Sequence, residues 1–401
     1  MLTIQEYLAY WPVLAGTLLF LILGLWMYLR TESAMERSTK PVSWVGDYRK
    51  PGFPFRTERL PWTRPFWLIP VLLALAAGVL IYLLRYNAGM IIFHRWLSYT
   101  GRTYNLLSAL IAAAGAFAVY VLLLVLFQSS FSALMGTLLF LVCPIHGHNT
   151  VSFLAVSALF LVLYLRSEGV GFRVELLYLC ACLFFALAAA VSPELLWLAP
   201  ALAVLHWYKL SWNLRHNLMG FGKLSLFLAA ALLGWLLFGI IAALSARFMH
   251  NYFSFAHFTE LLTPLRIRYA CSELWASAKE QIFQPLMRNR LLEPMLDAPL
   301  LGLGFWGLFS VGGMSIKRRR VQGWFVLGMT ALLGLIWLLS GCYTLTLPLT
   351  LAVGALAKNA ELGEKRGALL IVVLLGVLFS IGIAVGAWAL PLISPLAWRL
   401  L

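Results

Sequence analysis

The chain has 401 residues, of which 62% are hydrophobic and 11% are charged, whereas a soluble domain carries about a quarter charged residues. Apolar runs of roughly 18 or more residues recur from end to end, and such a run crosses about 30 Å of hydrocarbon as a helix. This excludes a large soluble helical protein, and the short alternating segments of a β-barrel are absent. The net charge of +15 follows the positive-inside rule and forms no basic stripe with interleaved aromatics, so no nucleic-acid partner is expected.

The apolar runs predict an all-α fold, a polytopic transmembrane bundle of about twelve helices, because backbone polar groups in lipid must be satisfied within each segment. The first span follows Glu6 and lacks both a basic flank and a small-residue cleavage site, so we expect a retained anchor helix and no signal peptide. In chain order the predicted spans are 10–29, 66–85, 104–127, 131–145, 151–166, 172–191, 194–209, 223–246, 298–315, 321–340, 342–357 and 367–390.

Four units follow from these spans. Residues 1–65 are predicted to be the N-terminal anchor helix and a basic, proline-rich cytoplasmic linker. Residues 66–246 form a membrane core, and residues 298–401 a C-terminal segment of four membrane helices. Between them, residues 247–297 are predicted to be an outer loop with a helix over about 269–286 that lies in the membrane interface.

The distribution of basic residues predicts the orientation. With the N-terminus outside, the segments 30–65, 128–130, 166–173, 209–223, 316–320 and 358–366 face the cytoplasm and hold 20 of the 30 Lys and Arg residues. Most of the remaining basic residues lie in the long outer loop, and long loops weigh less in this rule. We therefore expect a multi-pass protein of the plasma membrane, in a bacterial cell.

The five cysteines do not indicate a metal or redox site. None is spaced with another Cys or His as in a zinc motif. Cys180 and Cys182 are two residues apart on a predicted helix, so they point to different sides. We interpret the cysteines as small apolar side chains that fill the core.

A phrase that begins at the end of the fourth span and continues through the next three is the most informative part of the chain. It reads Cys-Pro-Ile-His-Gly-His-Asn over 143–149, then Leu-Tyr-Leu-Arg over 163–166 and Ser-Pro-Glu over 192–194. This stretch resembles the membrane half of GT-C class glycosyltransferases, and especially the O-mannosyltransferases that carry tetratricopeptide repeats, and their bacterial relatives. The matching residues are Leu139, Phe140, Pro144, His146, Tyr164, Arg166, Ser192 and Pro193.

The resemblance implies a GT-C-like core with an extra N-terminal helix, and the transfer of a sugar from a polyprenyl-phosphate donor on the non-cytoplasmic face. Members of this class use an acidic residue as base or to orient the acceptor, and basic residues to hold the donor phosphate, often with a divalent metal. The chemistry explains both needs, because the attacking hydroxyl must lose its proton and the leaving phosphate gains negative charge. A divalent metal is therefore a possible cofactor, although no cofactor is certain.

The chain departs from the class in its first outer loop, about residues 86–103, which contains neither Asp nor Glu. The glutamate that follows the histidine phrase in the class aligns with His148. Glu194 is then the candidate catalytic carboxylate, although Pro193 and the helix dipole also explain a carboxylate at that position. The candidates for binding the donor phosphate are Arg95, Arg102, Arg266 and Arg268, and a polar outer cavity would include His94, His146 and His148.

Three functions compete. The first is a membrane glycosyltransferase that uses a polyprenyl-linked donor. The second is a catalytically inactive protein of the same fold that binds a lipid-linked saccharide or supports a membrane protein partner, which the acid-free outer loop favours. The third is a transporter or flippase, disfavoured because few ionisable residues lie within the spans. Membrane lipid is an expected partner in all three.

Overall fold

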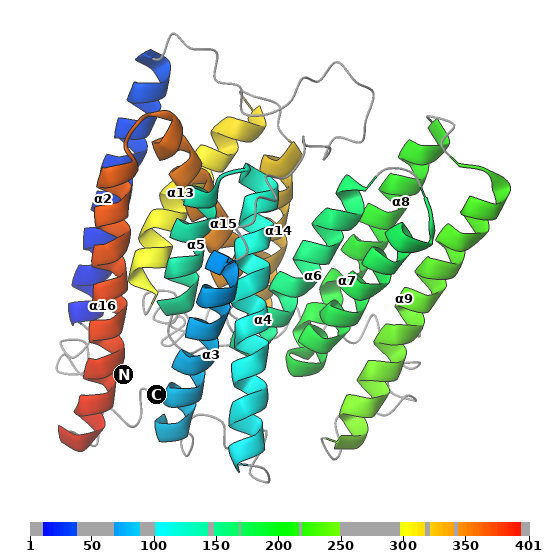
Figure 1. Ribbon diagram of the computed structural model, residues 1–401, viewed down its shortest axis with the longest axis horizontal. Coiled ribbons are helices and arrows are strands. Elements are labelled where there is room, and N and C mark those ends of the chain that lie inside the picture. Colours follow the sequence, from blue (N-terminus) through cyan, green and yellow to red (C-terminus); the bar gives the residue numbers. More distant parts are fainter. Residues whose placement is uncertain are drawn as a thin grey trace.

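The computed structural model describes residues 11–37, 68–88, 101–142, 148–167, 170–215, 219–248, 297–316, 321–340 and 344–393. Within these ranges the chain is entirely helical (Figure 1). The helices are α2 (Trp11–Arg37), α3 (Leu68–Ala88), α4 (Gly101–Phe127), α5 (Ser130–Val142), α6 (His148–Arg166), α7 (Phe172–Val191), the 3₁₀ helix η2 (Pro193–Leu198), α8 (Ala199–Arg215), α9 (Phe221–Phe248), α13 (Ala298–Ile316), α14 (Val321–Ser340), α15 (Thr346–Leu362) and α16 (Arg366–Ile393).

Three described helical segments are long and apolar enough to cross a membrane: Leu14–Ser33, Ala109–Phe127 and Phe172–Ala189. They coincide with three predicted spans. The other described helices contribute shorter apolar stretches, so the all-helical fold is confirmed for the described residues while the twelve-span count stays a prediction.

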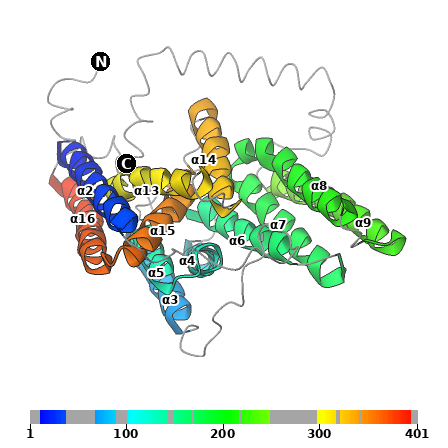
Figure 2. The same ribbon diagram turned by 90° about the horizontal axis from the view of Figure 1, so that it is seen from above.

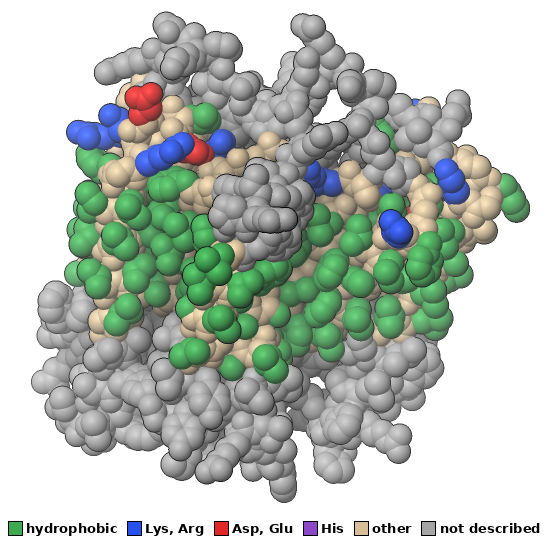
Figure 3. Space-filling model, in the orientation of Figure 1, with side chains coloured by type: hydrophobic (Ala, Val, Ile, Leu, Met, Phe, Trp, Pro, Cys, Tyr) green, Lys and Arg blue, Asp and Glu red, His purple; other side chains and the backbone are tan. Residues whose placement is uncertain are grey.

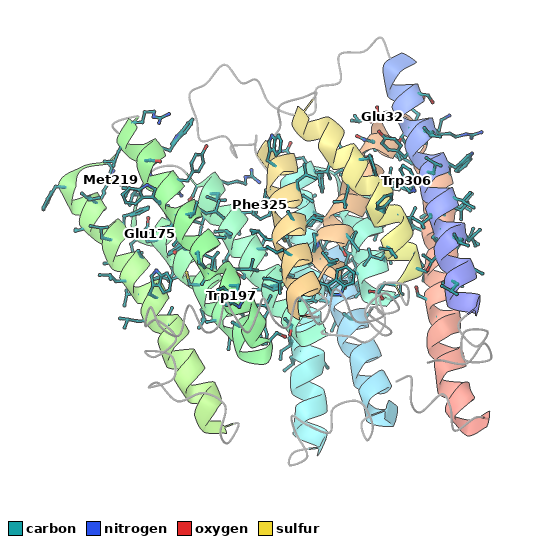
Figure 4. All side chains as sticks on the ribbon, turned by 180° about the vertical axis from the view of Figure 1, so that it is seen from behind. Glu32, Glu175, Trp197, Met219, Trp306 and Phe325 are labelled. Carbon is teal, nitrogen blue, oxygen red and sulfur yellow. The ribbon has the colours of Figure 1, made fainter. Side chains whose placement is uncertain are left out.

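Figure 3 colours the described residues by type and shows acidic and basic side chains gathered along the upper edge of the view, above a broad band of hydrophobic side chains. We call this the charged end; it contains the α6–α7, α8–α9 and α15–α16 connections (Figure 1). Figure 4 places Glu32, Glu175 and Met219 toward this end and Trp197 of η2 toward the other, which we call the opposite end.

Helix α15 lies at the centre of one group of helices, in contact with α13, α5, α2, α14, α4 and α16 (Figure 2). Fourteen of its 17 residues are buried, as expected for a helix that is apolar on all sides. Glycines allow the close approach of its neighbours, because a Cβ at Gly307 would lie 2.3 Å from the Ala352 carbonyl oxygen. A Cβ at Gly302 of α13 would likewise meet the backbone of Phe20 in α2.

Helices α6 to α9 form a second group. Helix α6 packs between α4 and α7, and α7 packs against α9 (Figure 2). The Ser157 hydroxyl of α6 donates a hydrogen bond of 2.8 Å to the Ala181 carbonyl of α7. Phe160 stacks on Phe184 at 5.8 Å between ring centroids. This group carries four of the eight residues that support the family resemblance: Tyr164, Arg166, Ser192 and Pro193.

Several predicted boundaries differ from the structure. Helix α2 continues to Arg37, into the predicted linker, whereas the first span was predicted to end at residue 29, and α8 continues to Arg215, beyond the predicted limit of 209. The predicted span 194–209 begins as η2 and becomes α-helical only at Ala199. The charged end of α15 extends to Leu362, beyond the predicted limit of 357. The linker over 38–65 and most of the outer loop, including the predicted helix over 269–286, lie outside the described residues.

Candidate functional site

Three residues of the sequence-predicted site fall on described backbone at the opposite end, because Arg102 is the second residue of α4, His148 the first of α6 and Glu194 the second of η2. Their side chains are outside the described part of the structure. The candidates His94, Arg95, His146, Arg266 and Arg268 lie wholly outside the described residues.

One hydrogen bond connects the two segments that carry His148 and Glu194. The hydroxyl groups of Thr150 and Ser192 lie 2.9 Å apart. Thr150 is two residues after His148 in the first turn of α6, and Ser192 is two residues before Glu194 at the end of α7. The backbone segments bearing these two candidates are therefore neighbours, although they are separated by more than 40 residues in sequence.

Ser192 also shapes the turn that carries Glu194. Its extended backbone (φ −133°, ψ 90°) ends α7, and its N–H donates to the Ala188 carbonyl. Pro193 then begins η2, since proline fits the first position of a helix, where its missing N–H is not needed. The Ser-Pro pair of the sequence thus produces a defined corner, held by the Thr150 hydroxyl.

A second polar cluster was not predicted from the sequence, and it lies at the charged end. It is formed by Tyr164 and Ser167 at the end of α6, Glu175 and Tyr178 at the start of α7, His206 and Lys209 in α8, and Phe227 in α9. We call it the α6–α9 polar cluster. Within the described residues it contains the most deeply buried charged side chains, since Glu175 and Lys209 are each only 1% exposed.

His206 is held by hydrogen bonds at both ring nitrogens. Nε2 lies 3.1 Å from the Phe227 carbonyl oxygen, which can only accept, so Nε2 carries the proton. In the neutral ring Nδ1 is then the acceptor, and the Tyr164 hydroxyl donates to it over 2.8 Å. The ring also lies between Tyr178 and Phe227, with centroid distances of 4.0 and 3.6 Å. His206 therefore joins all four helices of the group.

Lys209 is bound to the end of α6. Its ammonium group donates to the Tyr164 carbonyl oxygen and to Ser167 Oγ, the latter at 3.0 Å. It also lies 3.8 Å from the centroid of the Tyr164 ring, in cation–π geometry. A cation at a helix C-terminus is favourable because the last carbonyl groups carry partial negative charge. Lys209 thus acts as a tethered cap for α6.

Glu175 has a different environment. Neither carboxylate oxygen has a hydrogen-bond partner within the described structure, although both are buried. The positive charge of Lys209 acts on it electrostatically, and the two are on adjoining helices. Glu175 is therefore a buried carboxylate on which Lys209 acts through its charge, with no ion pair or hydrogen bond between the two in the described structure.

Helical spacing in the sequence is the signal that could have found this cluster. His206, Lys209 and Asn213 are separated by three and four residues, so they share one face of α8. All three are at most 3% exposed. A polar face on an apolar helix indicates a buried polar neighbour, and the sequence reasoning did not use the spacing of these three residues.

The candidate metal ligands are not tested by the structure. In the described ranges no group of three or more His, Cys, Asp or Glu side chains could hold a metal ion. Since the histidines of the predicted outer cavity lie outside those ranges or have no described side chain, a divalent metal stays a possibility from the resemblance alone.

Comparison with known proteins adds no relative. The chain matches no protein-family model, no curated protein and no solved structure. The GT-C resemblance therefore rests on the sequence phrases alone.

Proposed function

We propose that this chain is a multi-pass protein of the plasma membrane that binds a polyprenyl-phosphate-linked sugar at the opposite end of the bundle, on the non-cytoplasmic face. The observation that supports this site is the hydrogen bond between Thr150 and Ser192. This hydrogen bond joins the two segments that contain His148 and Glu194, and both segments belong to the stretch that resembles GT-C enzymes.

The distribution of Lys and Arg along the sequence supports the orientation. The charged end holds the segments richest in Lys and Arg among the short connections, and such segments remain in the cytoplasm. Glu194 and His148 then belong to the non-cytoplasmic face, where a polyprenyl-linked donor presents its sugar. Arg95, Arg102, Arg266 and Arg268 would supply positive charge for the donor phosphate, since a phosphate needs charge-assisted hydrogen bonds at the membrane surface.

In this proposal Glu194 accepts the proton of the acceptor hydroxyl as that hydroxyl attacks the sugar. The hydroxyl oxygen forms the new glycosidic bond, and the polyprenyl phosphate leaves with the electron pair of the broken bond. General-base catalysis of this kind contributes about 10²- to 10⁴-fold in rate.

The test uses the purified full-length chain in lipid nanodiscs with a radiolabelled polyprenyl-phosphate sugar. We expect specific binding of the labelled donor, reduced by the double substitution Arg266→Ala, Arg268→Ala. Glu194→Gln should retain binding and lower transfer by about 10²-fold or more. Glu32→Gln, a carboxylate at the charged end, is the matched control and should change neither.

The possible outcomes separate the hypotheses. Binding without transfer in the unmodified chain would indicate the catalytically inactive, saccharide-binding form of the proposal. If the unmodified chain retains the donor no better than an ordinary phospholipid of equal charge, the proposed function is wrong.

A further inference from the structure

An open pocket of about 570 Å³ lies at the charged end, at the turn between α15 and α16. Its lining includes two acidic and two basic side chains, Glu361, Glu364, Lys358 and Arg366, together with Gly367. Figure 3 shows acidic and basic side chains side by side in this region, at the upper left. A pocket of this volume is within the range of small-molecule sites, and its lining charge sums to zero.

Three of the four charged side chains in the pocket are held in place by ion pairs. Lys358 donates to Glu361 at 3.2 Å, and Arg366 donates to the other oxygen of Glu361 at 2.6 Å. Glu361 is thereby neutralised by two cations. The positive φ of 57° at Glu364 makes the turn between the helices tight, and this residue supplies the second lining carboxylate.

An apolar surface begins one turn below the pocket. Exposed side chains of α16 recur there at helical spacing on one side of the helix: Leu370, Ile371, Leu374, Leu375, Leu378 and Ile381. A polar pocket that opens onto an exposed apolar helix face has the shape and polarity of a phospholipid, whose headgroup is polar and whose tails are apolar.

We propose that the pocket binds the headgroup of a zwitterionic phospholipid that carries a phosphate and a primary amine, with its acyl chains along the exposed face of α16. Arg366 can donate hydrogen bonds to the phosphate, because its side chain is 59% exposed and its guanidinium group has further N–H donors besides the one bound to Glu361. The primary ammonium is matched by Glu364. A quaternary ammonium could not donate a hydrogen bond to this carboxylate, and an anionic glycerol headgroup would offer Glu364 no ammonium group.

This inference rests on the proposed membrane location and is independent of the saccharide chemistry. The experiment is native mass spectrometry of the full chain released from nanodiscs that contain equal amounts of three lipids with identical acyl chains. Their headgroups are ethanolamine, choline and glycerol. We expect retention of the ethanolamine lipid over the other two by about ten-fold, the effect of one charge-assisted hydrogen bond.

Gly367→Leu is the decisive variant. A Cβ at Gly367 meets no atom within 4 Å, so a leucine fits without strain and occupies the pocket. We expect it to abolish the headgroup preference. Gly328→Leu in α14 is the matched control, because Gly328 is equally open, and it should keep the preference. Glu364→Gln should reduce discrimination between ethanolamine and choline while the lipid is still bound.

Glycerophosphoethanolamine, which has no acyl chains, distinguishes the two parts of the site. Displacement of the lipid by this compound would show that the headgroup alone is recognised. If the compound does not displace the lipid while the ethanolamine lipid is still preferred, the acyl chains are needed for binding. Both results agree with a lipid site. Equal retention of all three lipids, or unchanged preference in Gly367→Leu, would overturn the proposal. Retention of no lipid at all would instead contradict the membrane location itself.

Discussion

At the scale of single residues, Lys209 joins the end of α6 to α8 and also acts through its charge on Glu175. Lys209→Met removes the donor to the Tyr164 carbonyl and to Ser167 and removes this positive charge from the neighbourhood of a buried carboxylate. Each buried polar group that is left without its partner costs about 1–3 kcal/mol. We expect a large loss of stability, measured as the unfolding midpoint of the purified protein in detergent.

The double variant Lys209→Met, Glu175→Gln tests the cause of this loss. If charge balance is responsible, the double variant regains part of the stability, with a coupling of about 0.5–3 kcal/mol. Additive effects of the two substitutions would contradict it. Lys223→Met, an exposed lysine at the start of α9, serves as control and should leave the midpoint unchanged.

Contacts between individual side chains were the part of the structure that the sequence predicted least completely. The phrase with Tyr164 and Arg166 was found through its resemblance to a family, but the hydroxyl of Tyr164 pairs with His206, 42 residues away. Such a pairing depends on how α6 and α8 approach each other. That approach is set by packing, which no local pattern contains.

At the scale of helices, Gly307 sets how closely α13 and α15 pack. Gly307→Ala would place a methyl group 2.3 Å from a backbone carbonyl oxygen of α15, which cannot move without shifting the helix. We expect a lower unfolding midpoint, since overpacking of a close-packed interior costs about 1–3 kcal/mol.

Gly328→Ala is the control for this variant, because open space surrounds it and alanine favours the helix over glycine. Its midpoint should be unchanged or slightly higher. An equal decrease in both variants would contradict this explanation, because the decrease would then not depend on the contact between α13 and α15.

Helix positions were predicted well, because hydropathy alone reveals long apolar segments. Even the short predicted spans 131–145 and 342–357 correspond to helices α5 and α15. The start of α8 was harder to predict. The corner at Ser192 and Pro193 introduces η2, and a 3₁₀ turn has no hydropathy signal of its own.

At the scale of the whole molecule, the orientation can be tested with cysteine labelling. Gly220→Cys lies in the α8–α9 turn, where a Cβ meets no atom within 4 Å. In a background without the five native cysteines, a membrane-impermeant thiol reagent added to intact cells should leave it unlabelled and label it only in opened membranes.

Ser98→Cys, in the predicted first outer loop, should show the reverse and react in intact cells. Labelling of Gly220→Cys from outside would place the charged end outside, and the Glu194 site would then face the cytoplasm. That result would contradict the positive-inside orientation and remove the site from the face where the proposed donor presents its sugar.

The near-complete burial of α15 has a consequence for the order in which the protein is made. Helices α2, α4, α5 and α13 leave the ribosome before α15, yet all of them contact it. They cannot close around the centre of their group until residue 362 has been synthesised. Helices α6 to α9, by contrast, are contiguous in the chain and can associate early. Helices α6 to α9 can therefore pack together while synthesis continues. The helices around α15 stay accessible to chaperones and proteases until α15 itself has been synthesised.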